Sequence, residues 1–520
     1  MTSYNRHGPW QLSALHLEGF KAFREYTTIP LRPLTLLFGA NSAGKSTILQ
    51  ALYLLRQSMT ADTPSMHLRL RGPRVIRPFG TFVDVLSHGL REGQQKMTVG
   101  MSAAMRGDPD SGVQTLHFVT NGPSPANTDV LRIDHVSVAS EHGAFLLFQA
   151  PSPGVRTLRS LSGQTEESNF LPGWTSQLVV EHPLIDQCWD RRGSIDWSRF
   201  ALRDYNQVRV SDVSESQDRV SFDHNLARLF DNEIRPVIKR EVPGLGFYTP
   251  ISWKLRRHVD DEQAGFWGAW SEPYHALRGT IGSLLYIPPM REVPSRDLFV
   301  PVSGERVFSD AAVSGRSVQS WHAWGPASAP AEWECRQMED RVNAWLRRLH
   351  VGVEIEWQGL YSQSNGERFM RAASLGCRQL GPDRATRFMH LSDVGFGVSQ
   401  ILPIVVNLMM TERRLVTIEQ PEVHVHPALQ AELGDCLAEA VVKQGHQVIC
   451  ETHSEHVVLR LQKLVRTRKL DPNLVTICCV TKGASGAAEV TEVRLDADGG
   501  MLGSWPGGFF AERLNELWDG

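Results

Sequence analysis

The sequence is poor in the features that mark several classes of protein. Its 520 residues include seven cysteines, an odd number without C-x-x-C spacing, which fits neither a disulfide framework nor a zinc site. No stretch reaches the ~18 apolar residues of a membrane span, because the longest candidate, residues 401–410, is interrupted by Pro403 and Asn407. The N-terminus is polar and lacks the apolar core of a signal peptide. We therefore expect a soluble, cytoplasmic protein that makes no contact with a membrane.

An excess of charge of one sign is also lacking. The 54 Lys and Arg residues against 57 Asp and Glu residues give a net charge of −3, so the field of the whole molecule does not attract polyanions. Any contact with nucleic acid must come from local basic patches. No heptad pattern is sustained, which argues against a long coiled-coil arm. With 41% hydrophobic residues the composition is that of a folded protein, and the length predicts two or three lobes.

The N-terminal region has the pattern of strand, loop and helix. Residues 34–38 are apolar except for Thr35, which is typical of a strand buried on both faces, whereas Leu15 and Leu17 alternate with polar residues as in a half-buried strand. Apolar residues recur at helical spacing after Lys45. A glycine-rich loop therefore joins a central strand to a helix.

That loop, GANSAGKS at residues 39–46, matches G-x-x-x-x-G-K-[ST] in the context that this motif requires. Backbone N–H groups and the positive end of the helix dipole hold phosphates in such a loop; Lys45 would neutralise the β- and γ-phosphates, and the Ser46 hydroxyl would bind Mg²⁺. The sequence therefore predicts binding of ATP with Mg²⁺. The expected contacts to the nucleotide are Gly39, Asn41, Ser42, Ala43, Gly44, Lys45, Ser46 and Thr47.

A later α/β segment delivers acidic residues to the end of a strand. Residues 415–418 resemble a Walker B strand that would place Glu419 beside the metal ion. Gln420 stands where ATPases of this class usually carry the glutamate that activates water. Because an amide cannot take the proton of water, we expect slow hydrolysis. Glu422 lies on the same side of an extended chain as Gln420, and it is either the substitute base or a cap of the following turn.

Two further segments complete the predicted nucleotide site. His453 follows a strand at residues 448–450 and precedes a helix, the place where ABC-type ATPases hold the histidine that senses the γ-phosphate. Residues 391–400 combine glycines and serines before a helix expected to begin near Ser399, as does the signature motif that contacts the γ-phosphate of a second subunit. The expected contacts are Ser392, Gly395, Gly397 and Ser399, with the contacting hydroxyl left open between the two serines.

These elements, in this order, resemble the RecF/OLD/SMC-like branch of the ABC-type ATPases, in the AAA family, where a long insertion separates Walker A from the signature and Walker B. LEGFKAF at residues 17–23 is similar to the first strand and turn of that group. IEQPEVHVHP at residues 418–427 and the tail from residue 490 to 510 are similar to a subfamily with an uncharacterised C-terminal domain. The similarity covers residues 12–95 and 282–515.

The resemblance implies an α/β fold class, with a split ABC-type P-loop ATPase head of the RecF kind and an inserted mixed α/β lobe. We expect residues 1–96 to form the N-terminal part of the head, residues 97–281 the inserted lobe, residues 282–470 the C-terminal part of the head and residues 471–520 a small C-terminal domain. Helices are expected at residues 332–349, 399–410, 427–443 and 454–466. Within the lobe, residues 130–138 and 145–148 are expected to be strands.

The resemblance also implies an ATP-closed homodimer that serves DNA repair or antiviral defence, together with a partner effector. The rival interpretation is a nucleotide-gated scaffold that hardly hydrolyses ATP and controls a partner toxin or nuclease. OLD-type nucleases append a metal-binding domain; too few residues follow His453 for one, and residues 496–500 are expected to form a hairpin turn. A basic loop is able to follow a DNA backbone, and its arginines are Arg69, Arg71, Arg74 and Arg77.

Overall fold

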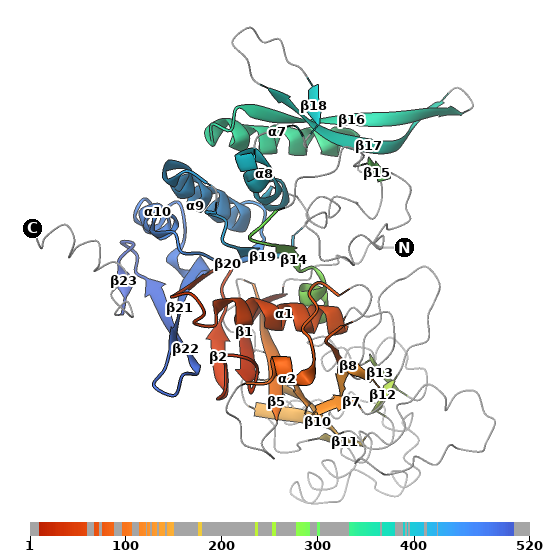
Figure 1. The fold of residues 1–520 in the computed structure, drawn as a ribbon, viewed down its shortest axis with the longest axis vertical. Coiled ribbons are helices and arrows are strands. Elements are labelled where there is room, and N and C mark those ends of the chain that lie inside the picture. The colour runs from red at the N-terminus through yellow and green to blue at the C-terminus, as the bar shows by residue number, and fades with distance from the viewer. Residues whose placement is uncertain are drawn as a thin grey trace, which may run out of the picture. The chain divides into compact units, whose positions relative to one another are not determined.

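The computed structural model describes the chain in separate stretches, which the coloured ribbon of Figure 1 shows. They comprise residues 10–59, 67–71, 75–87, 96–106, 114–120, 122–124, 127–132, 135–140, 143–149, 175–178, 234–237, 252–255, 277–291, 299–301, 332–364, 367–379, 388–390, 393, 396–409, 413–423 and 425–503. The chain divides into two compact units. Unit 1 consists of Met1–Thr28, Leu54–Arg71 and Phe79–Gly282, and unit 2 of Ile29–Tyr53, Gly72–Pro78 and Ser283–Gly520.

A seven-stranded sheet forms the centre of unit 2. Its strands, in spatial order, are β14 (Leu285–Ile287), β19 (Leu415–Glu419), β20 (Gln447–Glu451), β3 (Leu34–Phe38), β21 (Val475–Lys482), β22 (Ala488–Leu495) and β23 (Met501–Leu502). The first five strands are parallel to one another. Every residue of β3, β19 and β20 is buried, as expected for strands covered on both faces. The residues that follow these three strands therefore lie together at one edge of the sheet.

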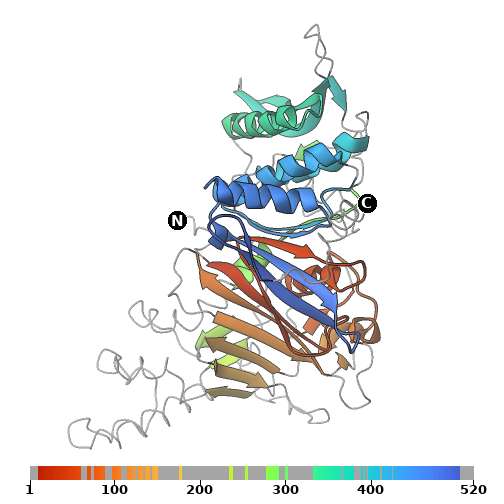
Figure 2. The same cartoon turned by 90° about the vertical axis from the view of Figure 1, so that its left-hand side faces the viewer.

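Four helices share a hydrophobic core with this sheet: α7 (Glu332–Arg348), α8 (Phe396–Leu408), α9 (Pro427–Val442) and α10 (Glu455–Arg466). Figures 1 and 2 show α8, α9 and α10 stacked over one face of the sheet. Three helices begin and end within a residue or two of the predicted positions. The start predicted for α8, Ser399, is wrong, because the helix extends back through Gly397, and glycine is tolerated where the first N–H groups have no partner within the helix. Among the described residues no helix is long and apolar enough to cross a membrane.

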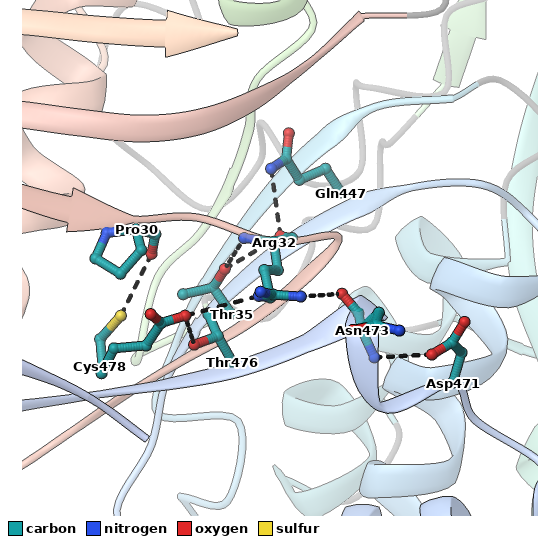
Figure 3. Close-up of polar contacts among 9 residues, drawn as sticks. Pro30, Arg32, Thr35, Gln447, Asp471, Asn473, Thr476 and Cys478 are labelled. Carbon is teal, nitrogen blue, oxygen red and sulfur yellow. Dashed lines mark hydrogen bonds and ion pairs between the residues drawn. The ribbon is translucent and has the colours of Figure 1, made fainter. Parts of the chain in front are cut away.

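Side chains at the amino ends of β20, β3 and β21 fix how these strands align (Figure 3). The guanidinium of Arg32, just before β3, donates to the carbonyl oxygen of Asn473 at 2.6 Å and lies 3.7 Å from the carboxylate of Glu492 on β22. The Gln447 side chain of β20 donates to the carbonyl oxygen of Arg32, and Thr35 bonds the backbone of the same residue. Because these contacts fix the register of β3 with its neighbouring strands at one end, they also determine which residues lie side by side at the other end.

A second sheet of unit 2 was not expected from the sequence. It consists of β15 (Phe299–Pro301), β17 (Glu367–Gln379), β16 (Val353–Ser364) and β18 (Phe388–His390), all antiparallel to their neighbours. Helix α7 is bonded to this sheet by Asn343, whose side-chain amide pairs with both the N–H and the C=O of Ile355, at 2.7 and 2.9 Å. The alternation of Val353, Ile355 and Trp357 with glutamates is a strand signal that could have predicted β16.

Unit 1 is built on an antiparallel sheet. Its strands, in spatial order, are β11 (Thr175–Leu178), β10 (Gly143–Gln149), β9 (His135–Ser140), β6 (Gln114–Thr120), β5 (Met97–Met105), β1 (Trp10–Glu18) and β2 (Thr27–Pro30). Shorter elements are β4 (His67–Arg69), α2 (Phe82–Val85), β7 (Gly122–Ser124), β8 (Asn127–Arg132), β12 (Ile234–Val237) and β13 (Ser252–Leu255). Strand β10 confirms the prediction at residues 145–148. The single strand predicted at residues 130–138 is wrong: its halves pair in different sheets, Val130 with Arg69 and Val136 with Phe118.

A polar network on this sheet surrounds one buried histidine. His16 Nε2 lies 2.7 Å from Ser102 Oγ, and its Nδ1 lies 3.1 Å from both Thr28 Oγ1 and the hydroxyl of Tyr26. The same tyrosine hydroxyl lies 3.0 Å from His117 Nε2. Burial, reinforced by the neighbouring His117, lowers the pKa of His16 to about 4. His16 is therefore neutral at pH 7, and its two nitrogens hold β1, β5 and the start of β2 together.

The C-terminal segment continues the sheet of unit 2. Strand β21 is parallel to β3, and β22 pairs antiparallel with both β21 and β23. The turn between β22 and β23 confirms the predicted hairpin, since Asp496 N donates to Gly500 O at 2.8 Å and Gly499 has a φ of 75°. The acidic residues of this segment thus belong to a turn. The domain boundaries expected from the sequence stay a prediction.

Candidate ATP-binding site

The loop after β3 has the geometry of a phosphate-binding loop. Gly39 has a φ of 141°, and a Cβ atom there would lie 2.1 Å from the carbonyl oxygen of Val480 on β21, so only glycine fits. Gly44 has a φ of 119° and Ser42 a φ of 58°, conformations that turn the chain sharply. Helix α1 (Lys45–Met59) begins immediately afterwards. The loop therefore leaves a central strand and enters a helix N-terminus, where backbone N–H groups favour an anion.

Lys45 is folded onto the loop that precedes it. Its Nζ donates to the carbonyl oxygens of Gly39 at 2.9 Å and Ala40 at 2.8 Å, and the residue is only 3% exposed. Burial lowers the pKa of Lys45, while the carboxylates of Glu451 and Glu422 oppose that effect. The ammonium group is thus the nearest fixed positive charge to the loop and is held at its mouth. Of the other expected contacts, Asn41 and Ser42 are exposed and Ala43 and Thr47 are buried.

Two carboxylates stand side by side at the carboxyl ends of β19 and β20. Glu419 and Glu451 are register partners on these parallel strands. The Ser46 hydroxyl donates to Glu451, at 2.8 Å from Oε2 and 3.1 Å from Oε1. Glu419 is 6% exposed, and its Oε1 lies 3.7 Å from a guanidinium nitrogen of Arg77. The predicted metal-side acid is therefore joined at this edge by a second acid, Glu451, that sequence reasoning passed over.

The pKa values of Glu419 and Glu451 are both raised, mainly by burial. Burial raises the pKa of Glu419, and the negative charge of Glu451 raises it further, against the opposing charge of Arg77. Burial also raises the pKa of Glu451, against the hydrogen bond from Ser46 and the charge of Lys45. Two enclosed carboxylates at adjacent strand ends favour a bound cation, because each is otherwise held near an uncompensated negative charge.

The turn after β19 is bonded to the end of β20. Gln420 N donates to Glu451 O at 2.7 Å, and Gln420 has a φ of 46°, a left-handed conformation that is strained for a residue other than glycine. Glu422 accepts two hydrogen bonds, from Thr452 Oγ1 at 2.8 Å and from the backbone N–H of His453 at 2.7 Å. Both oxygens of the Glu422 carboxylate therefore hold the segment that carries the predicted γ-phosphate sensor. The recorded contacts of this carboxylate are thus with the segment after β20 and not with the turn that follows Glu422, as the capping alternative had it; the role of substitute base stays a prediction.

His453 is half-buried at the start of this segment. Its ring lies 6.5 Å from the ring of Phe38, centroid to centroid, and among the described residues its Nε2 has no hydrogen-bond partner. Burial, and then the positive charge of Lys45, lower the pKa of His453, so the imidazole is neutral at pH 7. A neutral imidazole with one uncommitted nitrogen is able to make a hydrogen bond to a phosphate oxygen.

A buried arginine, which the sequence did not assign, links the Walker B turn to α8. Arg291 is 2% exposed, and its Nη2 donates to the carbonyl oxygens of Glu419 at 3.0 Å and Gln420 at 3.2 Å. The side chain of Gln400, in the first turns of α8, pairs with the backbone N–H and C=O of Arg291 at 3.1 and 2.6 Å. Burial lowers the pKa of Arg291 to about 10, which leaves it charged at neutral pH. The position of Arg291, soon after a predicted strand, was the sequence feature that could have identified it as a residue of the site.

The signature segment is only partly described. Ser392 and Gly395 lie outside the described residues. Gly397 is exposed in the first turn of α8, whereas Ser399 is 1% exposed and lies 3.4 Å from the side-chain nitrogen of Gln400. Burial of Ser399 favours Ser392 as the hydroxyl that a second subunit would present.

The arginines of the predicted DNA loop do not form one group. Arg69 lies in β4, where its backbone bonds Ser58 and Gln57, and Arg71 is exposed. Arg74 lies outside the described residues. Arg77 is instead the arginine beside Glu419. The sequence pattern, a basic residue in a loop with glycine and proline, is the same for an arginine that contacts nucleic acid and for one that pairs with Glu419. The pattern therefore could not distinguish these two roles.

The residues assembled here fit ATP with Mg²⁺. Mg²⁺ takes oxygen ligands, keeps several waters and is usually held by one or two carboxylates together with phosphates. Ser46, Glu419 and Glu451 supply a hydroxyl and two carboxylates, and the buried Oε1 of Glu419 has no hydrogen-bond donor among the described residues. In that part of the chain no cluster of three or more His, Cys, Asp or Glu residues is placed to hold a metal by itself.

A model of the AAA ATPase domain family matches residues 11–89 and 362–458. Among solved structures, the SMC head domain from Thermotoga maritima is 11% identical, with a TM-score of 0.35, over 92% of this chain and 98% of that chain. The SmcHead bound to the C-winged helix domain of ScpA is 10% identical, with a TM-score of 0.40, over 93% and 98%. An Smc head domain bound to a ScpA domain derived from Pyrococcus furiosus has the same identity and score, over 93% and 96%. No curated protein matches the chain.

The family match covers both the Walker A segment and the segment from the signature to His453. It confirms the predicted resemblance to P-loop ATPases of the AAA type, and the sheet with its covering helices confirms the α/β fold class. The two segments similar to the AAA ATPase domain family are separated by a long insertion.

Proposed function

We propose that this chain is an ATP-binding and slowly hydrolysing ATPase, similar to RecF and OLD proteins, whose ATP-driven dimerisation serves DNA repair or antiviral defence together with a partner effector. The observation that carries the proposal is the assembly at one sheet edge of the phosphate-binding loop, two strand-end carboxylates and His453. Each component comes from a different stretch of the sequence, yet all lie in unit 2.

The proposed roles follow from the contacts. Lys45 exchanges the carbonyl oxygens of its own loop for the β- and γ-phosphates, which are stronger partners for an ammonium group. Ser46 and Glu419 hold Mg²⁺, which when bound neutralises the charge that develops on the transferred phosphoryl group. His453 contacts the γ-phosphate with its uncommitted nitrogen. Gln420 orients the attacking water from a turn that Arg291 braces.

Slow turnover follows from what the turn after β19 lacks. Gln420 has no group able to take a proton from water, and general-base catalysis contributes about 10²–10⁴-fold. The carboxylate of Glu422 already accepts hydrogen bonds at both oxygens. These two observations favour a second candidate, the nucleotide-gated scaffold, in which binding rather than hydrolysis controls a partner. Measuring turnover with and without DNA separates the two, since stimulation by DNA favours the ATPase and an unchanged trace rate favours the scaffold.

ATP is expected to close a homodimer, because a signature segment at a helix N-terminus can stabilise a γ-phosphate only from across an interface. Light scattering with ATP and Mg²⁺ should give a higher mass for the parental protein than for Lys45→Ala. Lys443→Ala is the matched control, since Lys443 is exposed near the end of α9 and pairs only locally with Glu439. Equal masses for all three proteins would refute the dimer.

DNA binding is tested at two arginines of the predicted loop, Arg71, which is exposed, and Arg74. If Arg71 and Arg74 contact phosphates, replacing both by alanine should weaken binding to every sequence alike and flatten the salt dependence by roughly two units of slope. Arg77→Ala should leave that slope unchanged, because Arg77 lies beside Glu419. If the protein binds DNA in no nucleotide state, the proposed role in DNA repair is refuted and the scaffold function is favoured.

A further inference from the structure

Glu451 has a position that the roles proposed above do not use. It ends β20, which lies between the Walker B strand β19 and the phosphate-loop strand β3. In register, Glu451 stands beside Glu419 on one side and Leu37 on the other. Neighbouring strands are about 4.8 Å apart, so Glu451 is one strand closer to the phosphate-binding loop than the Walker B acid is.

The contact between Glu451 and Ser46 is compatible with a metal ion on the same hydroxyl. A serine hydroxyl has one proton to donate and two lone pairs to offer. Here the proton is directed at Glu451, at 2.8 and 3.1 Å from its two oxygens. The lone pairs are then left for a cation. A carboxylate that fixes the proton also fixes the direction in which the ligand oxygen faces, as groups behind metal ligands commonly do.

A second observation points to a cation at this edge. Glu419 is 6% exposed, and its Oε1 receives no hydrogen bond within the part of the chain that the structure describes. The positive group nearest to that oxygen by the recorded ion pairs is Arg77, at 3.7 Å, with a side chain that is 41% exposed. The two enclosed carboxylates thus have as recorded positive neighbours Arg77, which approaches Glu419 from solvent, and Lys45, whose charge acts on Glu451. A divalent cation would compensate both charges at once.

We propose that Glu451 is a second acidic residue of the Mg²⁺ site, which orients Ser46 by holding its proton and shares the cation with Glu419. This inference rests on the proposed function, because the cation is the one that accompanies the nucleotide. Glu451 is thus a positioning residue for Ser46, and Arg77 is the counter-ion of the pair when no metal is bound.

Metal affinity, rather than turnover, tests the assignment. The affinity for fluorescently labelled ADP is measured in EDTA and at saturating Mn²⁺, and the ratio of the two dissociation constants reports what the metal contributes. Glu451→Gln should bind ADP in EDTA at least as tightly as the parental protein, since a negative charge near the phosphates is removed. Its Mn²⁺-dependent ratio should fall about 10–100-fold, the usual effect of losing a group that supports a metal ligand.

Glu439→Gln is the matched control, because that carboxylate lies on α9 and pairs with Lys443 instead of Ser46. Its ratio should stay within about twofold of the parental value. Glu451→Asp keeps the charge and should retain more of the ratio than Glu451→Gln. Binding of ADP in EDTA shows that each variant is folded.

Three results overturn the inference: a parental ratio in Glu451→Gln, an equal loss in Glu451→Gln and Glu451→Asp, or an equal loss in the Glu439→Gln control. If the parental protein binds no ADP in either condition, the proposed function itself fails. If the parental protein binds ADP with a strong metal dependence that Glu419→Gln alone removes, only the role of Glu451 fails.

Discussion

Replacing Glu422 by glutamine tests how the turn after β19 is coupled to the γ-phosphate sensor. The parental carboxylate accepts one hydrogen bond from Thr452 Oγ1 and one from His453 N. An amide of the same shape presents one oxygen and one NH₂ group, so one of the two donors then faces another donor. If the backbone N–H of His453 loses its acceptor, the segment that carries the imidazole is no longer held.

The size of the effect follows from that exchange. A hydrogen bond to a charged acceptor contributes about 1.5–3 kcal/mol, and a loss of about 2 kcal/mol changes the population of the ordered segment roughly 30-fold. We therefore expect Glu422→Gln to bind ATP normally and to hydrolyse it about 10–100-fold more slowly in a single-turnover assay. Direct action of Glu422 as the general base would give a loss of about 10²–10⁴-fold instead.

A double-mutant cycle with His453→Ala separates the two roles. If Glu422 acts by holding His453, the double variant should be no slower than the slower single variant, because the same interaction has already been lost. If Glu422 takes the proton of water independently, the two losses should multiply. Thr452→Val, which removes only the other hydrogen bond to Glu422, should cause the smaller effect. A parental rate in Glu422→Gln would refute both roles.

Four other perturbations have expected outcomes. Gln420→Glu should raise turnover in a steady-state phosphate-release assay, because it adds a group able to take a proton where the amide stands. Gly39→Ala should lower both ATP affinity and the melting temperature, since its Cβ would lie 2.1 Å from a backbone oxygen. Arg291→Met should destabilise the protein by about 2–4 kcal/mol in a urea titration, because two buried carbonyl groups lose a charged donor. His16 binds a proton more readily in the unfolded chain than in the folded protein, because folding lowers its pKa to about 4. Its contribution to the free energy of unfolding, at most about 3 kcal/mol, is therefore present above pH ~6.5 and is lost as the pH falls toward 4. His16→Asn should flatten the dependence of the melting temperature on pH across that range.

Strands and helices with a strong periodic pattern could be predicted from the sequence. Residues 34–38 and 447–451 are continuously or mainly apolar because both faces of these strands are covered, and periodicity reports such burial directly. The long hairpin of β16 and β17 was not predicted, although residues 353–357 alternate regularly. The start of α8 was misplaced because two glycines in sequence indicate a loop, whereas Gly397 lies within the first helical turn.

The residues of the candidate site divide along the same line. Lys45, Ser46 and Glu419 could be predicted because a local motif fixes their spacing, and the motif describes one loop or one strand end. Glu451 and Arg291 were passed over because their importance lies in contacts with residues 405 and 128 positions away in sequence, to Ser46 and to the carbonyl oxygen of Glu419. No local pattern carries information about such pairs.

Arg77 shows why the distinction matters for function. In the sequence it is one of four arginines in a basic segment, and that pattern predicts contact with DNA phosphates. In the structure its guanidinium lies 3.7 Å from the Walker B acid, in unit 2 with the rest of the nucleotide site. A positive charge near buried carboxylates lowers their affinity for protons and competes with a metal ion for them. Removing the charge of Arg77 should therefore strengthen the proposed metal site.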